Sequence, residues 1–199
     1  ITGLRERQLG PIRKQMGVLF QGGALFDSLT VGENVAFPLR EAGLKDEKAI
    51  AARVAEALEI VHLAGEEDKR PPDLSGGMRK RAALARAIAH KPGCVLFDEP
   101  HTGLDPINAD SINHLIKDIQ RNQGVTNIVI THDLTSVFRI ADRIVFLEQG
   151  RIHWTGTPQE LRETQDPVLR AFIEGDSGES WEKPEIGRAS CRERVCVIV

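Results

Sequence analysis

The sequence predicts an α/β fold with a largely parallel central sheet. Residues 16–20, 94–97 and 127–131 are short apolar runs of the kind that form strands buried on both faces. The segments between these runs carry apolar residues at helical spacing. Strands that alternate with helices are typical of α/β domains, in which ligands bind beyond the carboxyl ends of the strands. We therefore expect the functional residues to follow the three apolar runs directly.

The helices expected in the first half of the chain have identifiable starts and stops. A short helix is expected over residues 33–39 and should be stopped by Pro38. A longer amphipathic helix is expected over residues 47–63, since its apolar positions recur every three or four residues at Ile50, Val54, Leu58 and Val61. Ser75 is a plausible N-cap for a third helix over residues 78–90, which the Pro-Gly pair after Lys91 should end.

The second half of the chain continues the same alternation. Asp105 and Pro106 should begin a helix that ends at Gly124 and turns inward Ile107, Ile112, Leu115, Ile116 and Ile119. Residues 143–148 and 151–155, separated by Gln149 and Gly150, form a predicted hairpin. A last helix is expected over residues 166–174.

Composition and charge exclude several classes of protein. The 199 residues carry 26 Lys and Arg against 29 Asp and Glu, a net charge of -3, without the basic excess of a nucleic-acid-binding protein. No stretch approaches the ~20 consecutive apolar residues that a membrane span requires. The cysteines, Cys94, Cys191 and Cys196, lack metal-ligand spacing and indicate a reducing compartment.

Two motifs carry chemistry. Asp98 and Glu99 directly follow a buried strand, where Asp98 would be a hard oxygen ligand for Mg²⁺ and Glu99 could orient a water molecule, although such a pair is often only a helix cap or loop anchor. Ser75, Gly76 and Gly77 open a helix, where free N–H groups and the helix dipole make an anion site. A plain Ser N-cap is the alternative.

The order and spacing of these motifs resemble the nucleotide-binding domains of ABC transporters over residues 1–175. The resemblance is carried by residues 74–87, residues 95–100, the Gly-Leu-Asp-Pro of residues 103–106 and the Thr-His-Asp of residues 131–133. It implies a P-loop NTPase-like domain with a parallel core sheet and a helical signature subdomain at about residues 30–90. The implied activity is hydrolysis of ATP to ADP and phosphate with Mg²⁺.

The resemblance also implies a role for each matching position. Ser75, Gly76 and Gly77 would form the signature motif, which contacts the γ-phosphate of ATP held by the opposite subunit of a homodimer. Asp98 would help to hold Mg²⁺, and Glu99 would be the general base or water-orienting carboxylate. His132 would be the switch histidine, Gln21 the Q-loop residue that senses metal and attacking water, and Asp105 part of the D-loop at the dimer interface.

One part of the family pattern is missing. No Gly-x-x-x-x-Gly-Lys-Ser/Thr loop, the main phosphate cradle, occurs in the chain. We therefore expect the domain to be incomplete at its N-terminus, the chain alone to be inactive, and the sheet to lack its phosphate-loop strand and so expose unpaired edges. Residues 176–184 are expected to be a polar linker. Residues 185–199 are interpreted as a translated sequencing adapter, because an adapter sequence encodes residues 186–195 residue for residue.

The substrate class rests on a narrower resemblance. Residues 18–40 are similar to the ATPases of the Mla and Mce lipid-trafficking systems, which implies a phospholipid transporter with an integral-membrane permease, an Mce-type substrate-binding protein and a place on the cytoplasmic face of the inner membrane. Leu25, Phe26 and Leu29 would then face the permease, or else pack on the helical subdomain. An ATPase of an amino-acid or other small-solute importer, or a soluble non-transport ABC ATPase, is the alternative. His101 departs from the small residue that family members often carry.

Overall fold

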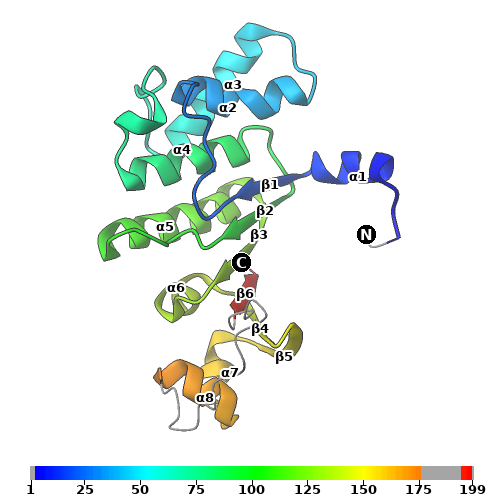
Figure 1. Ribbon diagram of the computed structural model, residues 1–199, viewed down its shortest axis with the longest axis vertical. Coiled ribbons are helices and arrows are strands. Elements are labelled where there is room, and N and C mark those ends of the chain that lie inside the picture. The colour runs from blue at the N-terminus through cyan, green and yellow to red at the C-terminus, as the bar shows by residue number, and fades with distance from the viewer. Residues whose placement is uncertain (1–2, 176–193, 199) are drawn as a thin grey trace, which may run out of the picture.

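The computed structural model describes residues 3–175 and the backbone of residues 194–198. A six-stranded sheet in the order β1-β2-β3-β6-β4-β5 runs through the domain, with one group of helices at one end and another beside its lower strands (Figure 1). The predicted α/β class is therefore confirmed, and all three expected parallel strands form.

The parallel part of the sheet contains β1 (Met16–Leu19), β2 (Cys94–Asp98) and β3 (Thr126–Thr131). Leu19 pairs with Phe97, and Asp98 pairs with Ile130, so all three strands end at the same edge. The predicted hairpin forms β4 (Arg143–Glu148) and β5 (Arg151–Gly156), which pair antiparallel.

The helical subdomain lies at one end of the molecule (Figure 1). It contains α2 (Val31–Glu41), α3 (Glu47–Ile60) and α4 (Gly76–Ile88), with the short 3-10 helix Pro71–Asp73 before α4. The apolar stripe predicted for α3 is buried. The expected stop at Pro38 is wrong: α2 continues past it to Glu41, because Thr30 and Glu33 form a capping box and Val31, Val35 and Leu39 are buried.

The remaining helices are α1 (Glu6–Arg13), α5 (Pro106–Gln123), α6 (Leu134–Ile140), α7 (Pro158–Glu163) and α8 (Pro167–Glu174). Asp105 caps α5 and Gly124 ends it, as predicted. Ile107 does not face inward: it is 82% exposed in the first turn of α5, whereas Ile112, Leu115, Ile116 and Ile119 are buried. None of the helices in the described ranges combines the length and apolar character that a membrane crossing requires.

A strand that the sequence did not predict joins the two halves of the sheet. β6 (Arg194–Ile198) lies between β3 and β4 and pairs antiparallel with both. We expected a sheet without its phosphate-loop strand to have unpaired edges, and β6 covers the edges of β3 and β4 that face each other. Most of the residues interpreted as linker and adapter, 176–193, lie outside the described residues.

Candidate active site

The carboxyl edge of the parallel strands collects the residues expected to carry chemistry. Gln21 follows β1, Asp98 ends β2 with Glu99 behind it, and His132 follows β3. Because the strands are parallel and in register, these segments meet at one edge. The structure thus brings together the three strand ends that the sequence identified.

Glu99 occupies an unusual backbone conformation. Its φ of 47° lies in the left-handed region, which costs a non-glycine residue roughly 1 kcal/mol. Its amide donates to the carbonyl of Ile130 at 2.8 Å, and the side chain is 10% exposed. The turn therefore holds a mostly buried carboxylate beyond the end of β2.

His132 contacts this carboxylate directly. Its Nδ1 lies 2.9 Å from Glu99 Oε1, and the Thr102 hydroxyl donates to the other carboxylate oxygen at 3.4 Å. The His132 side chain is 68% exposed. A tautomer with the proton on Nδ1 would donate to Glu99 and leave Nε2 free to meet a substrate.

The donor set suits Mg²⁺ only in part. Among the described residues there is no cluster of three or more His, Cys, Asp or Glu side chains that could hold a metal ion. Asp98 nevertheless supplies a carboxylate at the edge, and Gln21 supplies an amide on the neighbouring strand end. Mg²⁺ usually binds one or two carboxylates together with water and substrate phosphates, so this set fits a metal that arrives with a nucleotide.

Lys80 is a site residue that the sequence did not reveal. It is the middle residue of three consecutive cations, residues 79–81, on α4, and it is 6% exposed. Its Nζ donates to the backbone carbonyl of Gln21 and, at 3.4 Å, to that of Glu99. Burial lowers the pKa of Lys80, while the nearby Asp98 and Glu99 oppose this shift. Lys80 therefore ties α4 to two of the three strand ends.

The signature residues form the start of α4. Ser75 is the N-cap, with its hydroxyl accepting from the amide of Met78 at 3.3 Å, and the exposed Gly76 begins the helix. Asp105 accepts from the amides of Ile107 and Asn108, both at 3.0 Å, and from the Asn108 side chain at 2.6 Å. These bonds, foremost those from Asn108, lower the pKa of Asp105.

A cavity of about 360 Å³ opens beside the Glu99–His132 pair, between the segment after β2 and the helices α5 and α6. Its lining includes Glu99, His101 and His132 but neither Gln21 nor the signature residues. His101 is 8% exposed; burial lowers the pKa of His101, and Asp133 and the amide of Asn113 oppose this shift. The cavity therefore joins Glu99 and His132 and leaves Gln21 and the signature residues outside its lining.

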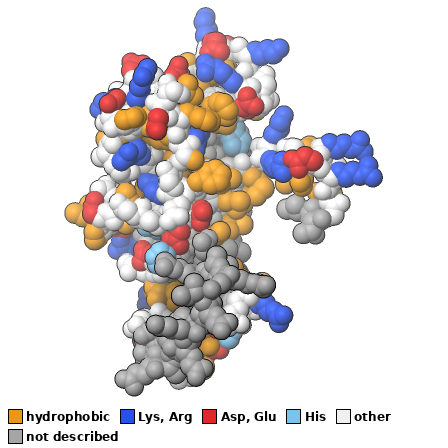
Figure 2. Space-filling model, in the orientation of Figure 1, with side chains coloured by type: hydrophobic (Ala, Val, Ile, Leu, Met, Phe, Trp, Pro, Cys, Tyr) orange, Lys and Arg blue, Asp and Glu red, His pale blue; other side chains and the backbone are white. Residues whose placement is uncertain are grey.

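A separate apolar groove lies along β1 and α4. Phe20, Phe26 and Phe37 line it and are 51%, 44% and 41% exposed, and Arg86 and His90 contribute polar groups. Hydrophobic side chains gather on the visible face where the helical subdomain meets β1 (Figure 2). Phe26 is therefore on an open surface as predicted, whereas Leu25 packs against the core and Leu29 is outside the groove.

Comparisons with known proteins agree with this architecture. Residues 2–102 match the family model described as ABC transporter. The phospholipid transport ATP-binding protein MlaF of Haemophilus influenzae is 43% identical over 89% of this chain and 67% of its own length. The iron import ATP-binding protein FbpC 2 of Rhizobium meliloti is 45% identical over 86% of this chain and 43% of its own length. The chain thus spans between two fifths and two thirds of these relatives.

A solved structure extends the likeness to three dimensions. The ATP-binding cassette MJ0796, in a dimeric post-hydrolysis state bound to ADP and Pi, superposes with a TM-score of 0.70 at 31% identity, covering 78% of this chain and 68% of that one. Fold, motif order and sequence identity all point the same way. The chain belongs to the ABC transporter ATP-binding family.

Proposed function

We propose that this chain is the catalytic part of an ATP-hydrolysing subunit that powers an ABC transporter. The observation that carries the proposal is the buried Glu99 carboxylate, held 2.9 Å from His132 beyond the strand that ends in Asp98. Glu99 would orient the attacking water and accept its proton. His132 would hold the carboxylate through Nδ1 and present its other nitrogen to the γ-phosphate.

The metal and the second subunit complete the proposed site. Asp98 and Gln21 would hold Mg²⁺, which when bound neutralises charge on the phosphates. Ser75, Gly76 and Gly77 would contact the nucleotide of the partner subunit in a homodimer, and Asp105 would lie at that interface. The signature residues do not line the Glu99 cavity, which supports this division of labour.

Glu99→Gln tests the reaction. In a chain extended at its N-terminus to include a phosphate-binding loop, the variant should lose at least about a hundredfold in turnover because the amide cannot accept a proton. ATP binding should persist. Glu163→Gln, an exposed change on α7, is the matched control. Undiminished turnover by Glu99→Gln would remove Glu99 from this role.

We further propose that an integral-membrane permease docks on the apolar groove, which would hold the protein at the cytoplasmic face of the inner membrane. Three exposed phenylalanines on one surface support a partner-facing role. Phe37→Glu should abolish co-purification with the permease while leaving ATP binding intact. Unchanged co-purification would place the permease elsewhere.

For the cargo we propose phospholipid, with an Mce-type substrate-binding protein in the complex. The likeness to MlaF over 89% of the chain supports this choice. An importer of a small solute is the second candidate, since FbpC 2 is equally similar in identity. ATPase activity of the reconstituted complex, measured in vesicles with labelled phospholipid and separately with Fe³⁺, distinguishes them: stimulation by Fe³⁺ alone would exclude the lipid proposal.

A further inference from the structure

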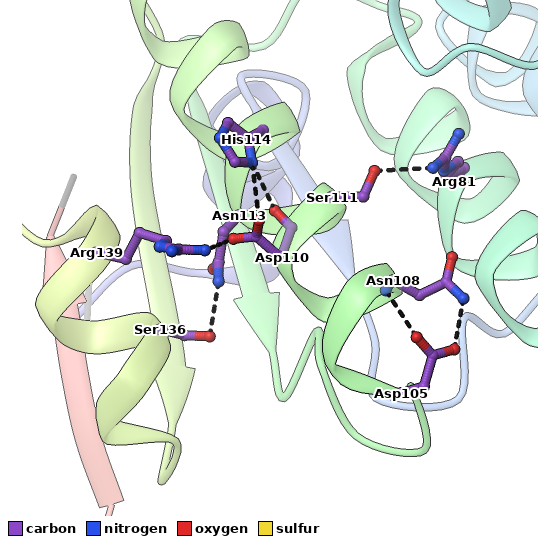
Figure 3. A network of polar contacts seen from close by, with 9 residues as sticks. All are labelled: Arg81, Asp105, Asn108, Asp110, Ser111, Asn113, His114, Ser136 and Arg139. Carbon is purple, nitrogen blue, oxygen red and sulfur yellow. Dashed lines mark hydrogen bonds and ion pairs between the residues drawn. The ribbon is translucent and has the colours of Figure 1, made fainter.

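A chain of polar contacts connects α5 to the segment that carries His132. The Asn113 side-chain amide donates to the Ser136 hydroxyl at 2.9 Å, a bond drawn in Figure 3. The Ser136 hydroxyl donates in turn to Asp133 Oδ2 at 2.5 Å. Asn113 is 4% exposed and Ser136 is 1% exposed. Buried polar side chains cost stability unless they are hydrogen-bonded. These hydrogen bonds therefore hold Asn113, Ser136 and Asp133 in fixed positions.

The side-chain carboxylate and the backbone amide of Asp133 are both hydrogen-bonded. Its Oδ1 accepts from the amide of Thr135 at 3.0 Å, and its own amide donates to the Thr131 hydroxyl at 3.1 Å. The backbone on both sides of His132 is therefore fixed by contacts that lead to Asn113. The His132 side chain is mostly exposed and the only contact described for it is with Glu99, so its position depends on this backbone.

These contacts form an open path. Asn113 leads through Ser136 and Asp133 to the backbone of His132, whose Nδ1 lies 2.9 Å from Glu99 Oε1. Neither ring nitrogen of the buried His101 has a hydrogen-bond partner among the described residues, so His101 does not close the path back to Glu99. The position of His132 against Glu99 therefore depends on the Asn113 end of the path.

We infer that Asn113 is a positioning residue for the hydrolytic pair. It acts through Ser136 and Asp133 to hold His132 against Glu99. The inference rests on the proposed ATPase function. Small displacements of catalytic groups are costly, which makes the anchor of an exposed side chain important for turnover.

A purely structural role would give a different result. α5 and α6 are also joined by the ion pair between Arg139 and Asp110, which Figure 3 shows beside the Asn113–Ser136 bond. This pair links the same two helices but does not contact Asp133. Arg139→Gln therefore weakens helix packing without breaking the hydrogen bonds that join Asn113, Ser136 and Asp133, and serves as the matched control.

The test uses the N-terminally extended chain as a dimer, with ATP turnover measured over a range of ATP concentrations. Asn113→Leu and Ser136→Ala should each lower kcat about fivefold to tenfold and leave KM within about twofold, because the loss of one buried hydrogen bond affects the transition state rather than binding. Arg139→Gln should retain the kcat of the unmodified protein. The double variant should be no slower than Ser136→Ala alone, since Asn113 acts through Ser136.

Three other results would contradict the positioning role of Asn113 or the function on which it rests. Equal losses in Asn113→Leu and Arg139→Gln would indicate helix packing, and additive losses in the double variant would show that the two residues act separately. If Asn113→Leu does not fold, as judged by its thermal unfolding, the smaller change Ser136→Ala decides. An unmodified protein that fails to hydrolyse ATP would overturn the proposed function instead.

Discussion

Gly77 is a glycine because α5 passes close to the start of α4. A Cβ atom built on Gly77 would lie 2.8 Å from Asn108 Oδ1, and the Asn108 amide donates to Asp105. The same contact is absent at Gly76, whose Cβ would meet only a Leu104 methyl group at 4.0 Å. One of the two signature glycines is therefore required by packing within the chain, in addition to any approach of phosphate.

Gly77→Ala should lower the free energy of unfolding by about 1 kcal/mol relative to Gly76→Ala, because only the former displaces a packed side chain. Urea denaturation of the two variants measures the difference. Gly76→Ala is the control, since alanine is favoured over glycine at an unobstructed helical position. Equal stabilities would show that Asn108 moves aside without cost.

At this scale the sequence predicts where candidate site residues lie when they follow a strand, and their roles stay predictions. Asp98, Glu99 and His132 each come directly after an apolar run, which fixes both their edge and their neighbours. Lys80 could not be predicted, because a run of three cations on a helix does not say which one faces inward. The bond from Asn113 to Ser136 joins two elements and has no local sequence pattern.

At the scale of elements, β1 and α4 approach each other closely at Gly17. A Cβ atom on Gly17 would lie 2.2 Å from the backbone carbonyl oxygen of Ala87, a distance that no side chain can occupy. Because neither strand nor helix backbone can yield locally, the two elements depend on this glycine for their packing. The apolar groove lies along the same junction.

Gly17→Ala should destabilise the domain by at least about 2 kcal/mol, since it forces α4 away from the sheet. Gly10→Ala on α1, where a Cβ meets nothing within 4 Å, is the matched control and should be neutral or slightly stabilising. Thermal unfolding followed by circular dichroism gives both values. A stable Gly17→Ala protein would mean that α4 can shift at little cost.

The cap of α5 should respond to acid. Hydrogen bonds from the backbone and side chain of Asn108 lower the pKa of Asp105 below its ordinary value of 3.8. The capping contribution is therefore fully present above that value and is lost as pH falls through the lower, folded-state pKa. Amide exchange at Ile107 and Asn108 should accelerate over that range. In Asp105→Asn the acid-dependent change should disappear.

Caps and amphipathic stripes are local, so helix starts at Ser75 and Asp105 could be predicted from sequence. Pro38 misled the prediction because the buried face of α2 outweighs the loss of one hydrogen bond. The seven-residue α6 and the six-residue α7 are too short for a periodic pattern to reveal.

At the scale of the whole molecule, β6 makes the sheet continuous. β3 and β4 do not pair with each other, and β6 supplies the backbone ladder between them. Its apolar, β-branched residues Val195, Val197 and Ile198 are typical of a strand, but the interpretation of residues 185–199 as adapter-encoded excluded them from the predicted sheet. Whether residues 185–199 are foreign is a separate question, and that interpretation stays a prediction.

Ending the chain at Pro184 should therefore reduce solubility, since it removes β6 and exposes the edges of β3 and β4. Light scattering and thermal unfolding of the shortened chain measure this effect. Adding an N-terminal segment that carries a phosphate-binding loop should restore a monodisperse protein if that segment provides a replacement strand. A shortened chain that is as soluble and stable as the original would show that β6 is dispensable.

The left-handed backbone at Glu99 lowers the stability of the fold, whereas the proposed hydrolysis needs the Glu99 carboxylate. Selection for stability and selection for activity therefore favour different residues at position 99. Asparagine tolerates this conformation better than glutamine does, although both remove the charge. A lineage released from the need to hydrolyse ATP would thus gain stability by drifting to asparagine or glycine at position 99. Retention of a carboxylate on a strained turn is what a protein under continuing selection for turnover would show.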